Sequence, residues 1–141
     1  MTLDQLQRAR LFFFAYGEAS ASGSLSAMKA VCYVIRNRVR RGWHDGNWLE
    51  VIEQADQVAG NQPTKKLPRL DVYSRSFQQL MQAVDEIYYS SSSDDTERVV
   101  DEALYYQFAD RPLRTWFTEN IIRHPQEHAR KAHIGTMVLF N

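Results

Sequence analysis

The residue in this sequence with the clearest chemical potential is a glutamate at the end of a strongly apolar stretch. Glu18 follows Leu11, Phe14 and Ala15 at helical spacings of seven, four and three residues, so the four side chains share one helix face. Burial against apolar neighbours disfavours the charged form of a carboxyl group, and one that keeps its proton near neutral pH can act as the acid of a glycosidase. The alternative is a glutamate that marks the solvent edge of an amphipathic helix and does no chemistry.

A second pattern lies near the C-terminal end. His124, Glu127 and His128 match the H-x-x-E-H arrangement of inverted zinc proteases. On a helix the two histidines could bind Zn²⁺, with Glu127 as the base and His133 as a third ligand. Pro125, however, fits only the first turn of a helix. We therefore expect a polar surface loop here, with no metal and no cofactor.

Several arginines and a tryptophan near residue 40 raise the question of a nucleic-acid surface. Acidic and basic residues balance at 17 each, so no net charge attracts nucleic acid. Positive charge near the C-terminal end of a helix is also favoured by the helix dipole. We expect a solvated helix end and no nucleic-acid partner. The residues concerned are Arg36, Arg38, Arg40, Arg41 and Trp43.

The elements that must position Glu18 are predicted to be mostly helical. Thr2 and Gln5 form a capping box that opens a first helix, which we expect to end near Gly17. A second helix over residues 24–41 carries an apolar stripe wide enough for a central, buried position. Cys32 lies within this stripe, so we expect a core residue rather than a nucleophile.

The second half of the chain is predicted to add helices and then a small sheet. In chain order we expect a short helix over 47–54, a loop over 59–70, a helix from Asp71 to Tyr88, an exposed connection over 90–95, and strands over 103–108 and 136–140. The expected fold class is α+β and mostly α, in one domain with its sheet towards the C-terminal end.

Four groups of residues occur in an order that is typical of one known family. The first surrounds Glu18, the second lies in the second predicted helix, and the last two flank or include the predicted strands. They are Tyr16-Gly17-Glu18-Ala19; Ala30-Val31, Val34-Ile35 and Asn37-Arg38-Val39; Asp95-Thr96 and Ala103-Leu104-Tyr105-Tyr106; and Ile134-Gly135 with Val138 and Phe140. Together they resemble the SleB-type cell-wall hydrolases, the spore-cortex-lytic enzymes, which have a lysozyme-like fold.

The resemblance implies a single lysozyme-like domain over residues 1–141, with Glu18 at the position of the family's catalytic glutamate. It implies cleavage of the β-1,4 bond between N-acetylmuramic acid and N-acetylglucosamine in peptidoglycan. Retaining glycosidases use a second carboxylate about 5–5.5 Å from the acid, and no motif here supports one. A lytic transglycosylase needs none, because the muramyl C6 hydroxyl attacks the anomeric carbon and one glutamate moves both protons.

The sequence also departs from the family pattern. Ser22 replaces the family's second glutamate, Met137 replaces its closing histidine, and Glu102 replaces a glycine. If the lost groups position substrate, the chain binds a variant glycan, turns over slowly, or is a non-catalytic glycan- or partner-binding module. The candidate substrate-binding residues are Gln57, Tyr105, Tyr106, Ser22 and Trp116. For the aromatic residues among them the alternative is packing in the core.

The N-terminal segment resembles a secretory signal only superficially. Arg8 and Arg10 precede an apolar run and Ala19-Ser20-Ala21 follows it, but the run is too short and cleavage there would remove Glu18. No stretch is long enough to span a membrane. We expect synthesis in the cytoplasm without a cleavable signal, and action in the periplasm or cell wall after non-classical export. The chain would be an antibacterial effector with a cognate immunity protein, or a phage lysin.

Overall fold

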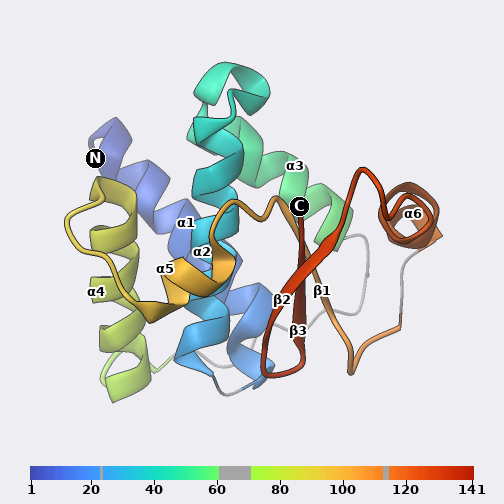
Figure 1. Cartoon of the computed structure of the whole chain (residues 1–141). Coiled ribbons are helices and arrows are strands. Elements are labelled where there is room, and N and C mark those ends of the chain that lie inside the picture. Colours follow the sequence, from blue (N-terminus) through green and yellow to red (C-terminus); the bar gives the residue numbers. More distant parts are fainter. Residues whose placement is uncertain (23, 61–70, 113–114) are drawn as a thin grey trace.

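Helix α2 (Leu25–Arg40) is the central element of the fold. The computed structural model describes residues 1–22, 24–60, 71–112 and 115–141. Within them α2 contacts four other helices and both neighbouring strands β1 and β2. Figure 1 shows α1 (Leu3–Ala19) and α4 (Arg75–Tyr89) on one side of α2 and the sheet on the other. The predicted central, buried helix is therefore confirmed.

Local capping explains where the first two helices begin and end. The Thr2 side chain accepts a hydrogen bond from the Gln5 N–H, and Gln5 returns a bond to the Thr2 N–H, which confirms the predicted capping box. Helix α1 ends at Ala19, two residues beyond the prediction. Ser24 caps α2, and Gly42 follows this helix with a φ of 85°, a conformation that glycine adopts without strain.

Two helices differ from their predicted limits. Helix α3 (Trp48–Gly60) is longer than expected, so residues 59–60 are helical rather than part of a loop. The rest of that predicted loop, residues 61–70, lies outside the described residues. Helix α4 is capped by Ser74, whereas Asp71 accepts a bond from the Tyr73 N–H in the preceding turn.

The C-terminal region forms a small antiparallel sheet. Strand β3 (Met137–Phe140) lies between β1 (Tyr105–Phe108) and β2 (Arg130–Ile134), and Tyr106 pairs with Leu139. Strands β1 and β3 confirm the predicted ones, but β2 was not predicted. The predicted connection is present over residues 90–94, and a short helix, α5 (Asp95–Val100), which was not predicted, follows it. The described residues therefore form an α+β fold that is mostly α, as expected.

The remaining turns complete the fold around the sheet. A 3₁₀ turn, η2 (Trp43–Gly46), follows α2, and a short helix, α6 (Thr115–Phe117), continues into a wider turn over Thr118–Ile122.

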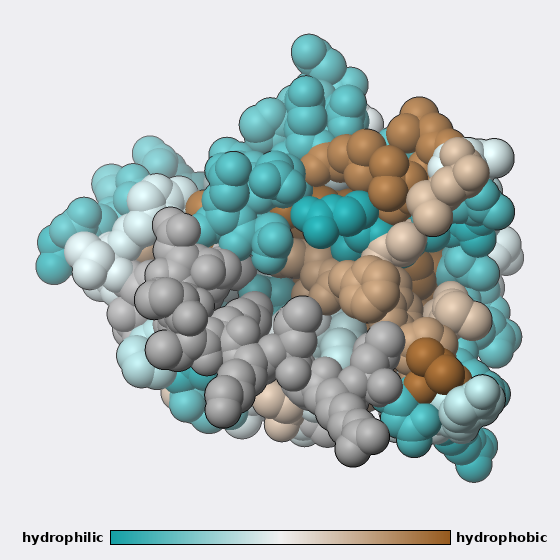
Figure 2. All heavy atoms as spheres, turned by 180° about the vertical axis from the view of Figure 1, so that it is seen from behind, coloured by the Kyte–Doolittle hydropathy of each residue, from teal (hydrophilic) through white to brown (hydrophobic). Residues whose placement is uncertain are grey.

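No helix in the described part of the chain is long and apolar enough to cross a membrane. Seen from behind, apolar side chains gather on one part of the surface beside hydrophilic ones (Figure 2). Large apolar side chains exposed on α1 include Leu3, Leu6 and Phe13.

Candidate functional site

Glu18 lies in the last turn of α1 with only 4% of its surface exposed. The residues predicted to share its helix face, Leu11, Phe14 and Ala15, are buried with it. The alternative of a glutamate at the solvent edge is therefore wrong. The helical spacing of apolar residues favours this burial, because a face that carries them packs against the core, but the spacing alone left the solvent-edge alternative open.

Strand β1 supplies a hydrogen bond to this carboxyl group. The hydroxyl of Tyr106 donates to Oε2 of Glu18 at 3.0 Å. The two residues are 88 positions apart in the chain, so the bond joins the end of α1 to the sheet. Tyr106 is half-buried. Of the two adjacent tyrosines, this is the one whose polar end meets the candidate catalytic group.

A cation lies near the same carboxyl group. Burial lowers the pKa of the Arg38 guanidinium, while the nearby Tyr106, Tyr105 and Glu18 act in the opposite direction. Nε of Arg38 donates to the carbonyl of Leu104 at 2.8 Å, which fixes the side chain against the start of β1. Arg38 therefore places positive charge close enough to interact with Glu18.

The main chain at the end of α1 is held as well. Nη2 of Arg111 donates to the backbone carbonyl of Glu18 at 2.8 Å. The Arg111 guanidinium also lies over the Phe108 ring, 4.2 Å from its centre. Because both the carbonyl and the carboxyl group of Glu18 are bonded, the position of this residue is fixed from two sides.

Helix α2 docks onto the segment that precedes β1. Nδ2 of Asn37 donates to the carbonyls of Asp101 and Ala103, each at 2.9 Å. The neighbouring Arg38 bonds the carbonyl of Leu104 in the same segment. Asn37 and Arg38 thus attach the C-terminal half of α2 to this segment. Their bonds set where β1 starts, and thus where Tyr106 meets Glu18.

The expectation that the arginines form a solvated helix end is wrong for two of them. Arg36 is 3% exposed and donates to Glu97 at 2.5 Å and to the Ile87 carbonyl at 3.1 Å. Arg38 packs against the segment before β1. Arg36 finds oxygen partners in the interior, which allows its cation to be buried, whereas Arg38 is half-buried and bonds one main-chain carbonyl. Only Arg40 and Arg41 are exposed as predicted.

The other predicted site residues take no part in the contacts described for Glu18. The exposed Ser22 donates from its hydroxyl to the Ala19 carbonyl at 2.6 Å and closes the turn after α1. Gln57 is exposed on α3, and Trp116 is exposed on α6. Met137 is completely buried in β3, so this residue fills space in the core.

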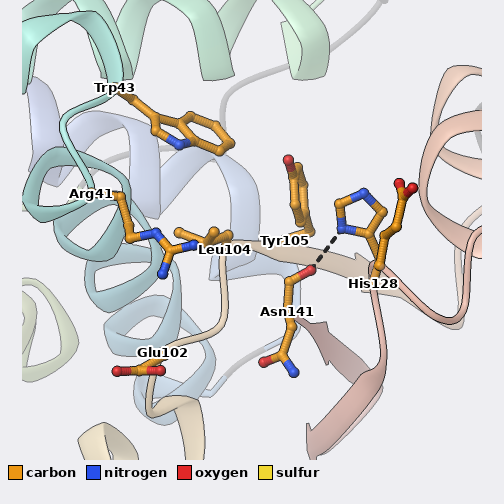
Figure 3. Close-up of a pocket in the computed structure, with 8 residues that line it drawn as sticks. Arg41, Trp43, Glu102, Leu104, Tyr105, His128 and Asn141 are labelled. Atoms are coloured by element: carbon orange, nitrogen blue, oxygen red, sulfur yellow. Dashed lines mark hydrogen bonds between the residues drawn. The ribbon is translucent and has the colours of Figure 1, made fainter.

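A cavity of about 420 Å³ opens near the start of β1. Tyr105 lines it, but Glu18 is not among its lining residues. Figure 3 shows residues around it from the turn after α2, from the start of β1, from the end of β3 and from the segment before β2, all at one end of the sheet. The lining residues are Arg41, Trp43, Glu102, Leu104, Tyr105, Glu127, His128 and Asn141.

The zinc pattern does not have the geometry that it requires. Residues 124–128 form turns rather than a helix, and the His128 N–H donates to the His124 carbonyl at 2.8 Å. Within residues 1–22, 24–60, 71–112 and 115–141, no three histidine, cysteine, aspartate or glutamate side chains are grouped so as to hold a metal ion. The polar surface segment that we expected is present, since His124 and Glu127 are exposed.

The fold and the site define an α+β domain in which a buried carboxyl group is held between a helix end and a strand. No protein-family model, curated protein or solved structure matches this chain. Function is therefore inferred from the geometry of the site and from the motifs of the sequence.

Proposed function

We propose that this protein is a peptidoglycan glycosidase of the SleB type, with a lysozyme-like fold and Glu18 as its general acid and base. The observation that carries the proposal is the position of Glu18, which is buried at the end of α1 and bonded by the Tyr106 hydroxyl. A buried carboxyl group that is held in one orientation can serve as the general acid and base of glycoside cleavage when a glycosidic oxygen lies within its reach.

The contacts of the site come from the same motifs that carry the family resemblance. Asn37 and Arg38 belong to the second motif, and they bond the segment that contains the third. Tyr106 in that third motif bonds Glu18 in the first. Residues that are scattered along the sequence thus meet around one carboxyl group, which supports a common role for them.

The proposed reaction is a lytic transglycosylation. Glu18 gives its proton to the glycosidic oxygen, and the bond from C1 of N-acetylmuramic acid to that oxygen breaks. The C6 hydroxyl oxygen of the same sugar then bonds to C1, and its proton passes to Glu18, so the enzyme is regenerated. Because the nucleophile is part of the substrate, its proximity supplies much of the rate. The cation of Arg38 stabilises the carboxylate between the two proton transfers.

The second candidate function is a non-catalytic glycan- or partner-binding module on the same scaffold. The observation that favours it is the loss of two family residues, because Ser22 only closes a turn and Met137 lies in the core. As an enzyme, the protein would act in the periplasm or cell wall after non-classical export. A contact-delivered effector would have an immunity protein that covers the site, and a phage lysin would not.

The test is digestion of purified peptidoglycan by the wild type and by Glu18→Gln, followed by mass spectrometry of the fragments. Anhydro-muropeptides from the wild type alone are the expected result. Products with a reducing end would show that the reaction is hydrolysis rather than transglycosylation. An absence of products from both proteins would support the non-catalytic binding module. Glu119→Gln is the matched control, because Glu119 is exposed in the turn after α6. A parallel digestion with a chelator tests the zinc alternative, which loss of activity would restore.

A further inference from the structure

The cavity beside β1 has a wall made of three rings. The ring centres of Trp43 and Tyr105 lie 5.8 Å apart with a tilt of 54°. The His128 ring meets Tyr105 edge to face, with centres 4.9 Å apart. Figure 3 shows the three rings at the same end of the cavity, contributed by η2, β1 and the segment before β2. A ligand with a flat apolar face can stack on such a wall.

The charges around this wall favour a ligand without positive charge. The Arg38 guanidinium already lies 5.0 Å from the Trp43 ring centre and 5.6 Å from that of Tyr105. A cationic ligand on the same rings would be repelled by this fixed charge. The lining side chains include the cation of Arg41 and the carboxylates of Glu102 and Glu127. With Arg38 included, these formal charges sum to zero.

The polar rim offers hydrogen-bond partners of both kinds. The carboxylates of Glu102 and Glu127 accept, and the guanidinium of Arg41 donates. Nδ1 of His128 lies 2.9 Å from the Asn141 carbonyl, which can only accept, so Nδ1 is the protonated nitrogen. In the neutral ring Nε2 is then an acceptor. Acceptors and donors beside an aromatic wall match the hydroxyl groups and the apolar face of a sugar ring.

Glu18 does not line the cavity, although the Arg38 side chain lies near both the cavity rings and Glu18. Successive side chains of a strand point to opposite faces, so Tyr106 reaches Glu18 while Tyr105 turns to the cavity. The cavity volume of about 420 Å³ lies within the range of small-molecule sites, roughly 300–1,000 Å³. A sugar held here would therefore not be the sugar cleaved at Glu18.

We propose that this cavity is an accessory saccharide-binding site for a neutral N-acetylated sugar unit. One of the tilted Trp43 and Tyr105 rings stacks on the sugar ring while the other borders it, and Glu127 and His128 bond its hydroxyl groups. That the sugar belongs to the same glycan on which Glu18 acts rests on the proposed function. The site would hold the enzyme on an insoluble polymer between cleavage events.

The experiment is a titration of Glu18→Gln with chitotetraose, a chain of four β-1,4-linked N-acetylglucosamine units, followed by the indole N–H resonances of the tryptophans. Trp43→Phe identifies the Trp43 resonance. We expect that resonance to shift saturably at millimolar ligand, while that of Trp116, which does not line the cavity, stays in place. Glu127→Ala and His128→Ala should each weaken binding about three- to tenfold, as expected for one lost hydrogen bond. Glu119→Ala should leave binding unchanged.

Two results would overturn the accessory site. One is a Trp43 resonance that does not move with chitotetraose. The other is a resonance that moves with tetramethylammonium instead, which would make the cavity a cation site. Neither result contradicts the proposed function, because peptidoglycan cleavage by the wild type is measured in a separate experiment. Conversely, saturable binding at Trp43 without any cleavage would retain the accessory site and remove the catalytic role of Glu18.

Discussion

Removal of one hydroxyl group, in Tyr106→Phe, tests the link between strand β1 and the candidate acid. The hydroxyl donates to Glu18 at 3.0 Å, which is at the long end for O–H···O bonds of about 2.5–3.0 Å. A hydrogen bond contributes about 0.5–1.5 kcal/mol between neutral groups and about 1.5–3 kcal/mol when one partner is charged. Because Glu18 is charged only between its two proton transfers and Tyr106 is half-buried, the value at which these ranges meet, about 1.5 kcal/mol, applies. At about 1.4 kcal/mol per factor of ten, kcat/KM should fall roughly tenfold.

The assay is the initial rate of anhydro-muropeptide release from purified peptidoglycan, at substrate concentrations low enough to report kcat/KM. Tyr73→Phe is the matched control, because it removes a hydroxyl from a tyrosine that is exposed in the turn before α4. Thermal unfolding of both variants shows whether the fold is retained. The reasoning is refuted if Tyr106→Phe retains the wild-type rate, or if Tyr73→Phe loses as much as Tyr106→Phe.

Three further predictions concern the scaffold and its titratable groups. Arg36→Met leaves Glu97 without its buried partner, so the free energy of unfolding measured in urea should fall by about 3 kcal/mol. The control is Arg98→Met at an exposed ion pair, which should change that free energy by less than about 1 kcal/mol. Burial raises the pKa of the Cys32 thiol to about 12. A thiol reagent should therefore label this residue at neutral pH only when urea unfolds the protein. Rapid labelling of the native state would contradict this burial. Burial raises the pKa of the Asp94 carboxyl, but hydrogen bonds that include one from Lys29 outweigh it and hold that pKa below its ordinary 3.8. Because this pKa is lower in the folded protein than in the unfolded chain, Asp94 stabilises the fold above pH 3.8. The stabilisation is lost as the pH falls through the pKa of the folded state. Acid unfolding curves should therefore show a smaller loss of stability in Asp94→Asn than in the wild type, and equal losses would show that Asp94 contributes nothing.

The elements that were predicted correctly depend on neighbours in the sequence. Thr2 and Gln5 are three positions apart, and their reciprocal bonds mark the start of α1 without help from other elements. The elements that were missed depend on distant partners. Strand β2 has the polar sequence Arg130–Ile134 and exists through its pairing with β3. Helix α5 has only six residues, too few for a clear periodic pattern.

The candidate site shows the same division. The spacing of apolar residues on one helix offers burial of Glu18 as one of two alternatives, and the packing of α1 decides in its favour. The choice of Tyr106 over Tyr105 as its partner depends on how β1 is placed and could not be predicted from the sequence. The arginines were misjudged for a related reason. Charge and position favour a solvated helix end, but the buried oxygen partners of Arg36 come from residues more than 50 positions away.

The sequence by itself determined the long helices and the mostly α character of the fold, and it narrowed the position of Glu18 to two alternatives. Local hydrogen bonds and periodicity carry that information, because they act between residues a few positions apart. The tertiary structure alone decided the order of the sheet, the partners of Glu18 and the cavity lined by Trp43 and Tyr105. These features require residues from distant segments to meet, and only the packing of α2 against the other elements brings them together.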